Sequence, residues 1–215
     1  MPSGWSNSSG AGRVARDTRP NHDNGAPSRE IIYDLAGGPG EGRSIKFWFP
    51  GGSSAPVLPG TDEFLDLPYD FDSMAKAGSM LGSGAIIVVD DTNPVVDVAL
   101  KTAKFYRHES CGKCTPCREG TNWTVKMLER IDDGTATPMD LDIMASVCDQ
   151  IMGNCLCVLG DAMAMPIASM IKHFREEVED HMERVQLSSI EMARELGAGP
   201  YDPNEPTPVV LAERV

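Results

Sequence analysis

Three cysteines recur at every third position in the stretch ESCGKCTPCREG, at Cys111, Cys114 and Cys117. Thiolates bind zinc and iron–sulfur centres, and two-residue gaps let the backbone turn around one such centre. A buried hydrophobic role would not require this period. A fourth thiol can come from a second stretch, IMGNCLCVLGD, which carries Cys155 and Cys157, and spacing alone does not distinguish these two.

Three ligands in one arm and a remote fourth are the arrangement expected for a cubane iron–sulfur cluster. Zinc more often takes its four ligands as two pairs, so zinc is the weaker alternative, and reactive redox thiols are a third. Lys113 and Arg118 flank the thiols and either stabilise the reduced centre or are solvated surface charges. Cys148 falls on the apolar face of a predicted helix, where we expect a buried free thiol.

The composition excludes some classes of function. The chain has 215 residues, 41% of them hydrophobic and 24% charged, and its net charge is −13. Such an acidic chain is not expected to bind nucleic acid. It lacks an apolar run that could span a bilayer and the apolar core of a secretory signal, so we expect a cytoplasmic protein without direct membrane insertion. In that compartment clustered cysteines are more often ligands than disulfides.

The first part of the chain predicts a disordered segment and a small domain. Residues 1–28 are rich in Gly, Ser, Asn and Pro and bury little surface, so we expect disorder there. Residues 29–95 predict a small α+β domain of few strands. Apolar alternation over 45–49 and the continuous apolar run of GAIIVVDD, at 84–91, are both typical of strands.

The second part of the chain predicts helices. Residues 96–187 contain four segments with helical spacing of apolar residues, and their short connections favour a helical bundle. The clearest repeat runs over 167–185, and the cysteine stretches fall between segments. Residues 188–215 are Pro-rich without periodicity, so we expect a tail.

The stretch ESCGKCTPCREGTNW resembles the cluster-binding segment of the NADH-binding subunit of respiratory complex I, which is the F-type subunit in bacteria. PGGSSAPVL and DFDSMAKAGSMLGSGAIIVVDD look like that family's soluble-ligand-binding β-grasp domain, and GNCLCVLGDAMAMPIASMIKHFREEVEDH resembles its fourth-ligand loop and final helix. The resemblance covers residues 29–185. It implies an α+β fold: a small β-grasp domain over 29–95, followed by a four-helix iron–sulfur bundle over 96–187.

The resemblance also implies a cofactor and its ligands. The family's fourth ligand directly precedes an Ala/Val-Leu-Gly-Asp motif, which here selects Cys157. A four-iron four-sulfur cluster would then be held by Cys111, Cys114, Cys117 and Cys157, with no catalytic residue. It would accept electrons from flavin mononucleotide (FMN) and pass them towards quinone. The implied partners are other peripheral-arm subunits, especially the two-iron-cluster subunit, and the implied location is the cytoplasmic side of the inner membrane, through the complex.

The family's N-terminal flavin and NADH domain has no counterpart in this sequence. The glycines of DLAGGPGEGR follow a predicted helix rather than opening one after a strand, so they do not predict a phosphate-binding loop. We therefore expect the C-terminal half of such a protein, from a truncated or mispredicted reading frame. It would not oxidise NADH alone, and FMN and NADH belong to the full-length subunit. Two alternatives are a diaphorase fragment of an NAD-linked hydrogenase or formate dehydrogenase, and a zinc-stabilised β-grasp binding module.

Overall fold

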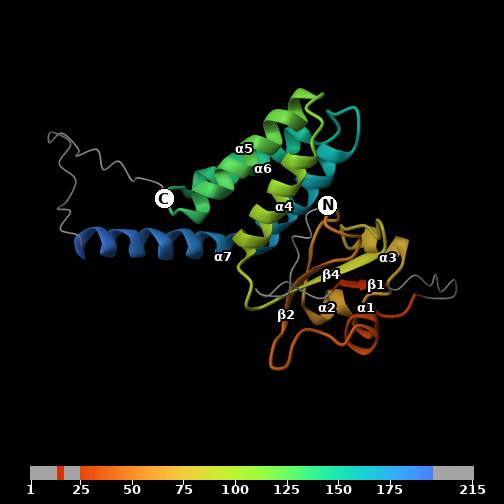
Figure 1. Cartoon of the computed structure of the whole chain (residues 1–215). Helices are drawn as coiled ribbons and strands as arrows, with labels where there is room; N and C mark the ends of the chain where they lie inside the picture. Colours follow the sequence, from red (N-terminus) through yellow and green to blue (C-terminus); the bar gives the residue numbers. More distant parts are fainter. Residues whose placement is uncertain (1–13, 17–24, 196–215) are drawn as a thin grey trace, which may run out of the picture.

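The computed structural model describes residues 14–16 and 25–195. They form an α+β fold in which a small antiparallel sheet is joined to four long helices, as predicted. Figure 1 shows helices α4 to α7 gathered on one side of the sheet, with the short helices α1 and α2 beside the strands.

The sheet has the strand order β1-β4-β2-β3, and every neighbouring pair is antiparallel. Its strands are β1 (Val14–Arg16), β2 (Ile45–Phe49), β3 (Leu58–Pro59) and β4 (Ala85–Asp90). The two central strands, β2 and β4, are those that the apolar patterns predict. β1 lies inside the segment predicted to be disordered, whose positions 1–13 and 17–24 are outside the described residues.

Short helical segments accompany the sheet, and four longer helices follow it. The short ones are α1 (Ser28–Glu30), the π-helix η1 (Ile31–Leu35), α2 (Asp62–Leu65) and α3 (Phe71–Lys76). The long ones are α4 (Val95–Glu109), α5 (Thr115–Asp132), α6 (Pro138–Ile151) and α7 (Leu159–Glu195). No helix in the described ranges offers an apolar stretch that would cross a bilayer.

The last helix is longer than its apolar repeat indicates. α7 starts at Leu159, ahead of the repeat at 167–185, and contains Pro166, which removes one backbone donor from the helix. It also continues past 187 into the predicted tail, and residues 196–215 are outside the described part of the chain. Met163, Ala164 and Ile167 around the proline are at most 1% exposed, so tertiary packing holds the helix together across it.

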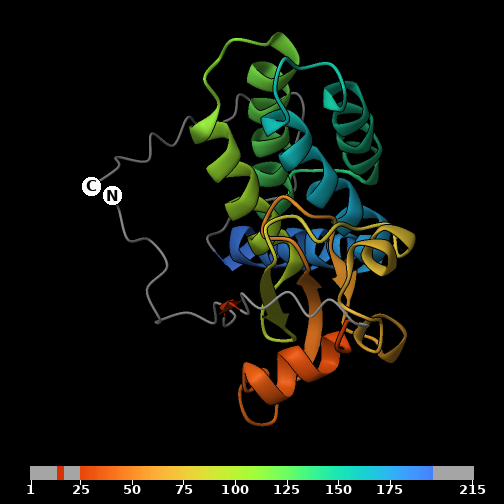
Figure 2. The same cartoon turned by 90° about the vertical axis from the view of Figure 1, so that its right-hand side faces the viewer.

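The sheet separates two apolar cores. On one face, Phe47, Phe49 and Val89 pack with the inward sides of the four long helices. On the other face, Trp48, Ile86 and Val88 pack with the short helices. Figure 2 shows this layering, with the strands between the long helices and the orange segment that contains α1 and η1. Burial on both faces explains why the run in β4 is continuously apolar.

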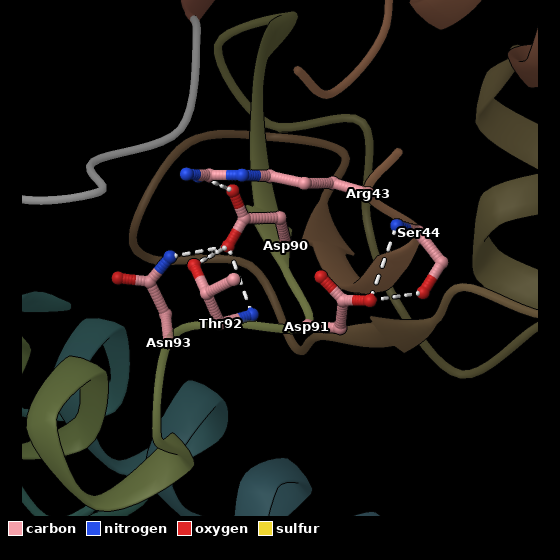
Figure 3. Close-up of polar contacts among 6 residues, drawn as sticks. All are labelled: Arg43, Ser44, Asp90, Asp91, Thr92 and Asn93. Carbon is pink, nitrogen blue, oxygen red and sulfur yellow. Dashed lines mark hydrogen bonds and ion pairs between the residues drawn. The ribbon is translucent and has the colours of Figure 1, made fainter. Parts of the chain in front are cut away.

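A turn built on Asp90 leads the chain from β4 into α4 (Figure 3). Its carboxylate accepts hydrogen bonds from the Thr92 backbone amide and hydroxyl and from the Asn93 side chain, and it pairs with Arg43 at 2.7 Å. Burial works against ionisation of Asp90, but these donors outweigh it and lower the pKa of Asp90. The turn fixes the direction in which α4 leaves the sheet towards the cysteines.

A second polar contact links the sheet to the last helix. Glu177 Oε1 on α7 accepts hydrogen bonds from Lys46 Nζ on β2 at 2.7 Å and from the Val95 amide at 3.1 Å. The Val95 amide belongs to the first turn of α4, whose amides lack partners within the helix. Glu177 therefore connects strand, first bundle helix and last bundle helix through one carboxylate oxygen.

Candidate metal centre

The first cysteine stretch spans the connection between α4 and α5. Cys111 lies in the connection, Cys114 precedes the first residue of α5, and Cys117 falls inside the first turn of that helix. Only two of the three thiols are thus in the connection, because the helix begins at Thr115, directly before Pro116. Proline suits the first turn of a helix, where amides have no helical acceptor, so the sequence itself specifies this start.

Hydrogen bonds fold this stretch back on itself. The Ser110 hydroxyl lies 3.3 Å from Cys117 Sγ and accepts a hydrogen bond from the Gly112 amide at 3.3 Å. Arg118 Nη1 donates to the Gly112 carbonyl at 2.7 Å, and Gly112 itself has a positive φ of 74°. Arg118 therefore holds the loop backbone closed, a role that its flanking position in the sequence did not reveal.

The second cysteine stretch connects α6 with α7. Gly153 turns the chain with a φ of 72°, and its amide donates to Asp161 Oδ1 at 2.8 Å, so the first turn of α7 fixes the loop. Asn154 donates from its side chain to the carbonyls of Gln150 and Met152. These contacts order the backbone on both sides of Cys155.

One contact joins the two stretches directly. The Leu156 backbone amide donates a hydrogen bond to Cys114 Sγ at 3.2 Å, across 42 residues of sequence. Backbone amides directed at ligand sulfurs are typical of iron–sulfur sites, where they favour the more negative, reduced centre. No residue type in the sequence signals this amide, because any residue other than proline could supply it.

The thiols differ in how deeply they lie. Cys117 is buried, Cys114 and Cys155 are half-buried, and Cys111 and Cys157 are exposed. Burial raises the pKa of the Cys155 thiol, and its electrostatic interaction with Cys117 and Cys114 raises it further.

Cys148 is fully buried on α6 in the bundle core, as its place on the apolar face predicts. Its surroundings are apolar, and burial raises the pKa of its thiol to about 12. Such a thiol stays neutral and does not act as a metal ligand, since ligation requires the thiolate.

The donor set fits an iron–sulfur cluster. In the described part of the chain, no three His, Cys, Asp or Glu side chains are arranged around a single ion. A cubane does not need this arrangement, because each of its four irons takes one thiolate and the ligands stand around a larger object. The two stretches supply five thiols, and the Leu156 amide joins one stretch to a sulfur of the other.

Comparisons with known proteins agree with this chemistry. Residues 97–181 match the family model of the NADH-ubiquinone oxidoreductase-F iron-sulfur binding region. The chain is 43% identical over 195 residues to the NADH-quinone oxidoreductase F subunit of Mycobacterium bovis, covering 91% of this chain and 40% of that protein. It is 48% identical over 159 residues to the second F-type subunit of Rhizobium meliloti, covering 74% of this chain and 37% of that protein.

The chain is homologous to the F subunit of NADH-quinone oxidoreductase. It corresponds to the C-terminal, iron–sulfur-binding region and spans about 40% of the length of the F-subunit relatives it matches. A crystal structure of NAD+-reducing [NiFe]-hydrogenase also resembles it, with a TM-score of 0.64 and 27% identity over 83% of this chain and 31% of the hydrogenase chain. The fold, the family model and the cysteines thus point to the same kind of site, a four-iron four-sulfur centre.

Proposed function

We propose that this region of the F subunit binds a four-iron four-sulfur cluster through Cys111, Cys114, Cys117 and Cys157 and relays electrons within NADH:quinone oxidoreductase. The observation that supports this best is the Leu156 amide on Cys114 Sγ, because it docks the second cysteine stretch onto the first. When bound, the cluster supplies one-electron transfer at a potential set by its protein surroundings.

The chain's own residues shape that potential and hold the ligands. The Leu156 amide stabilises negative charge on Cys114, and the Ser110 hydroxyl lies beside Cys117. Hydrogen bonds of this kind raise a cluster's potential, because they favour the reduced state. Arg118 keeps the loop closed through the Gly112 carbonyl, so the three thiols of the first stretch keep their spacing.

NADH oxidation by FMN, in this proposal, belongs to the part of the F subunit that this chain does not span. The two F-subunit relatives are covered to 40% and 37% of their length. The proposed partners are other peripheral-arm subunits of complex I, above all the two-iron-cluster subunit. The proposed location is the cytoplasmic face of the inner membrane, reached through the complex.

The diaphorase part of a hydrogenase is a second candidate, supported by the structural similarity to NAD+-reducing [NiFe]-hydrogenase. The identity to that chain is 27%, against 43% and 48% for the quinone oxidoreductase subunits, so the respiratory assignment is favoured. Isolation of the native complex separates the two. Co-purification with quinone-reducing activity supports the first, and hydrogen-dependent NAD+ reduction supports the second.

Anaerobic reconstitution of the chain with iron and sulfide tests cluster binding. We expect about four irons and four sulfides per chain and a brown colour with absorbance at about 400 nm. Cys117→Ala should abolish loading, whereas Cys148→Ala, which alters a thiol of the bundle core, should leave it unchanged. A colourless protein that binds one zinc would contradict the proposal and favour the zinc-stabilised module.

A further inference from the structure

Cys155, in the second stretch, lies close to the thiols of the first stretch. A methyl group built on Gly160 would lie 3.0 Å from Cys155 Sγ and 3.6 Å from Cys117 Cβ, so both atoms flank the same point at the start of α7. Cys155 is half-buried, whereas Cys157 is exposed. Cys157, which the family's ligand motif selects, is therefore more solvent-accessible than Cys155.

The Cys155 thiol makes a weak polar contact with the end of α6. Its sulfur lies 3.8 Å from the Ile151 carbonyl, which is long for a hydrogen bond. A thiol is a weak donor, and such a contact is readily given up for a metal bond. The two thiols are separated by Leu156, so the Cα atoms of Cys155 and Cys157 lie no more than about 7 Å apart.

We propose that Cys155 is a reserve ligand, able to replace Cys157 as the fourth thiolate at the cluster. This inference rests on the proposed cluster binding by the other three cysteines. On replacement, the bond between Cys157 Sγ and its iron would break and the released thiolate would take a proton from solvent, while Cys155 would lose its thiol proton to solvent and its sulfur would bond to the same iron. No electron is gained or lost in the exchange.

The geometry explains why replacement requires only a local change. The Leu156 amide donates a hydrogen bond to Cys114 Sγ. This bond holds the middle residue of the Cys155–Cys157 segment against the first cysteine stretch, whichever of the two cysteines binds the cluster. Asp161 fixes the loop from the other end through the Gly153 amide. The exchange would therefore need a change only in the short Cys155–Cys157 segment between these two contacts.

Three variants of the full chain test the proposal: Cys157→Ser, Cys155→Ala and the double variant C155A/C157S. Each is reconstituted anaerobically, and iron, sulfide and the electron paramagnetic resonance (EPR) spectrum of the reduced sample are measured. We expect Cys157→Ser to keep iron within about twofold of the parent chain, with altered EPR g values, and the double variant to lose the four-iron signal by about tenfold or more. Cys157→Ser and the double variant carry the same serine, so any difference in cluster content between them is due to Cys155.

Far-UV circular dichroism checks folding, and Cys157→Ala repeats the comparison without a hydroxyl ligand. The proposal is overturned if Cys157→Ser or Cys157→Ala binds as little iron and sulfide as the double variant. It is also overturned if either chain does not fold with iron and sulfide present. Alkylation gives a second reading: Cys155 should be modified in the loaded parent chain and protected in the loaded Cys157→Ser chain. If the parent chain and Cys155→Ala also bind no cluster, cluster binding itself has failed rather than the reserve role.

Discussion

Gly160 lies where the two cysteine stretches and the start of α7 meet, and its replacement by alanine tests the packing of the site. The added methyl group would lie 2.7 Å from Ile151 Cγ2 and 3.0 Å from Cys155 Sγ, closer than ordinary contact at 3.4–4 Å. The Cγ2 atom of Ile151 is attached to a stiff β-branched carbon, so it does not rotate away without leaving its rotamer. The backbone or the Cys155 side chain must therefore shift.

The magnitude follows from two opposing effects. Overpacking of a well-packed site costs about 1–3 kcal/mol. Alanine in place of glycine stabilises a helix interior by about 1 kcal/mol, and by less here because Gly160 is the second residue of α7. We expect Gly160→Ala to lower the free energy of unfolding by about 1–2 kcal/mol, a sizeable part of the stability of a small protein.

Urea unfolding of the cluster-free chain measures this change as a lower midpoint at unchanged slope. Gly40→Ala is the matched control, because a methyl group there would lie 3.6 Å from Arg43 Cδ, in ordinary contact, and we expect a change within about 0.5 kcal/mol. Equal or higher stability of Gly160→Ala would refute the packing argument.

Two further predictions concern a half-buried carboxylate, Glu177, and a buried thiol, Cys148. Glu177→Ala leaves the Val95 amide without its acceptor and removes one of two acceptors of Lys46, whose ammonium also donates to the Asn93 carbonyl, and we expect urea unfolding to show a loss of about 1–3 kcal/mol. Glu129→Ala removes an exposed pair at 3.0 Å and should cost about 0.2–1 kcal/mol; equal losses would contradict the role of Glu177. Burial raises the pKa of Cys148 from 9.0 to about 12, so its contribution to stability is complete below pH 9.0 and is lost as the pH rises towards about 12. At pH 8, alkylation followed by mass spectrometry should modify Cys157 in the folded, cluster-free chain and Cys148 only after unfolding; rapid labelling of folded Cys148 would contradict its burial.

The sequence specified the helices well where local rules and packing agree. The Thr137–Pro138 pair predicts the start of α6, and in the structure the Thr137 amide and hydroxyl both donate to the Asp140 carboxylate at that point. The strands β2 and β4 are likewise visible as an alternating and a continuous apolar run. In these elements the local pattern and the tertiary burial favour the same state.

The start of α7 shows where local rules failed. The repeat at 167–185 begins after Pro166, and a proline normally ends a helix, so the local pattern does not indicate that the helix already begins at Leu159. In the structure Met163 and Ala164 are fully buried before the proline, and Ser169 Oγ donates to the Pro166 carbonyl at 2.8 Å. Burial of these side chains in the bundle outweighs the donor lost at Pro166, and this burial depends on three other helices.

By itself, the sequence determined which kind of centre the chain can hold, because the number, type and spacing of thiols restrict the chemistry to a few metals. It also determined that the thiols stand at helix ends, through Pro116 and the glycines of both loops. Only the tertiary structure decided that Leu156 contacts Cys114 and that Cys155 lies deeper than Cys157. These two facts depend on how α5, α6 and α7 pack, and packing joins residues far apart in the chain that no local pattern relates.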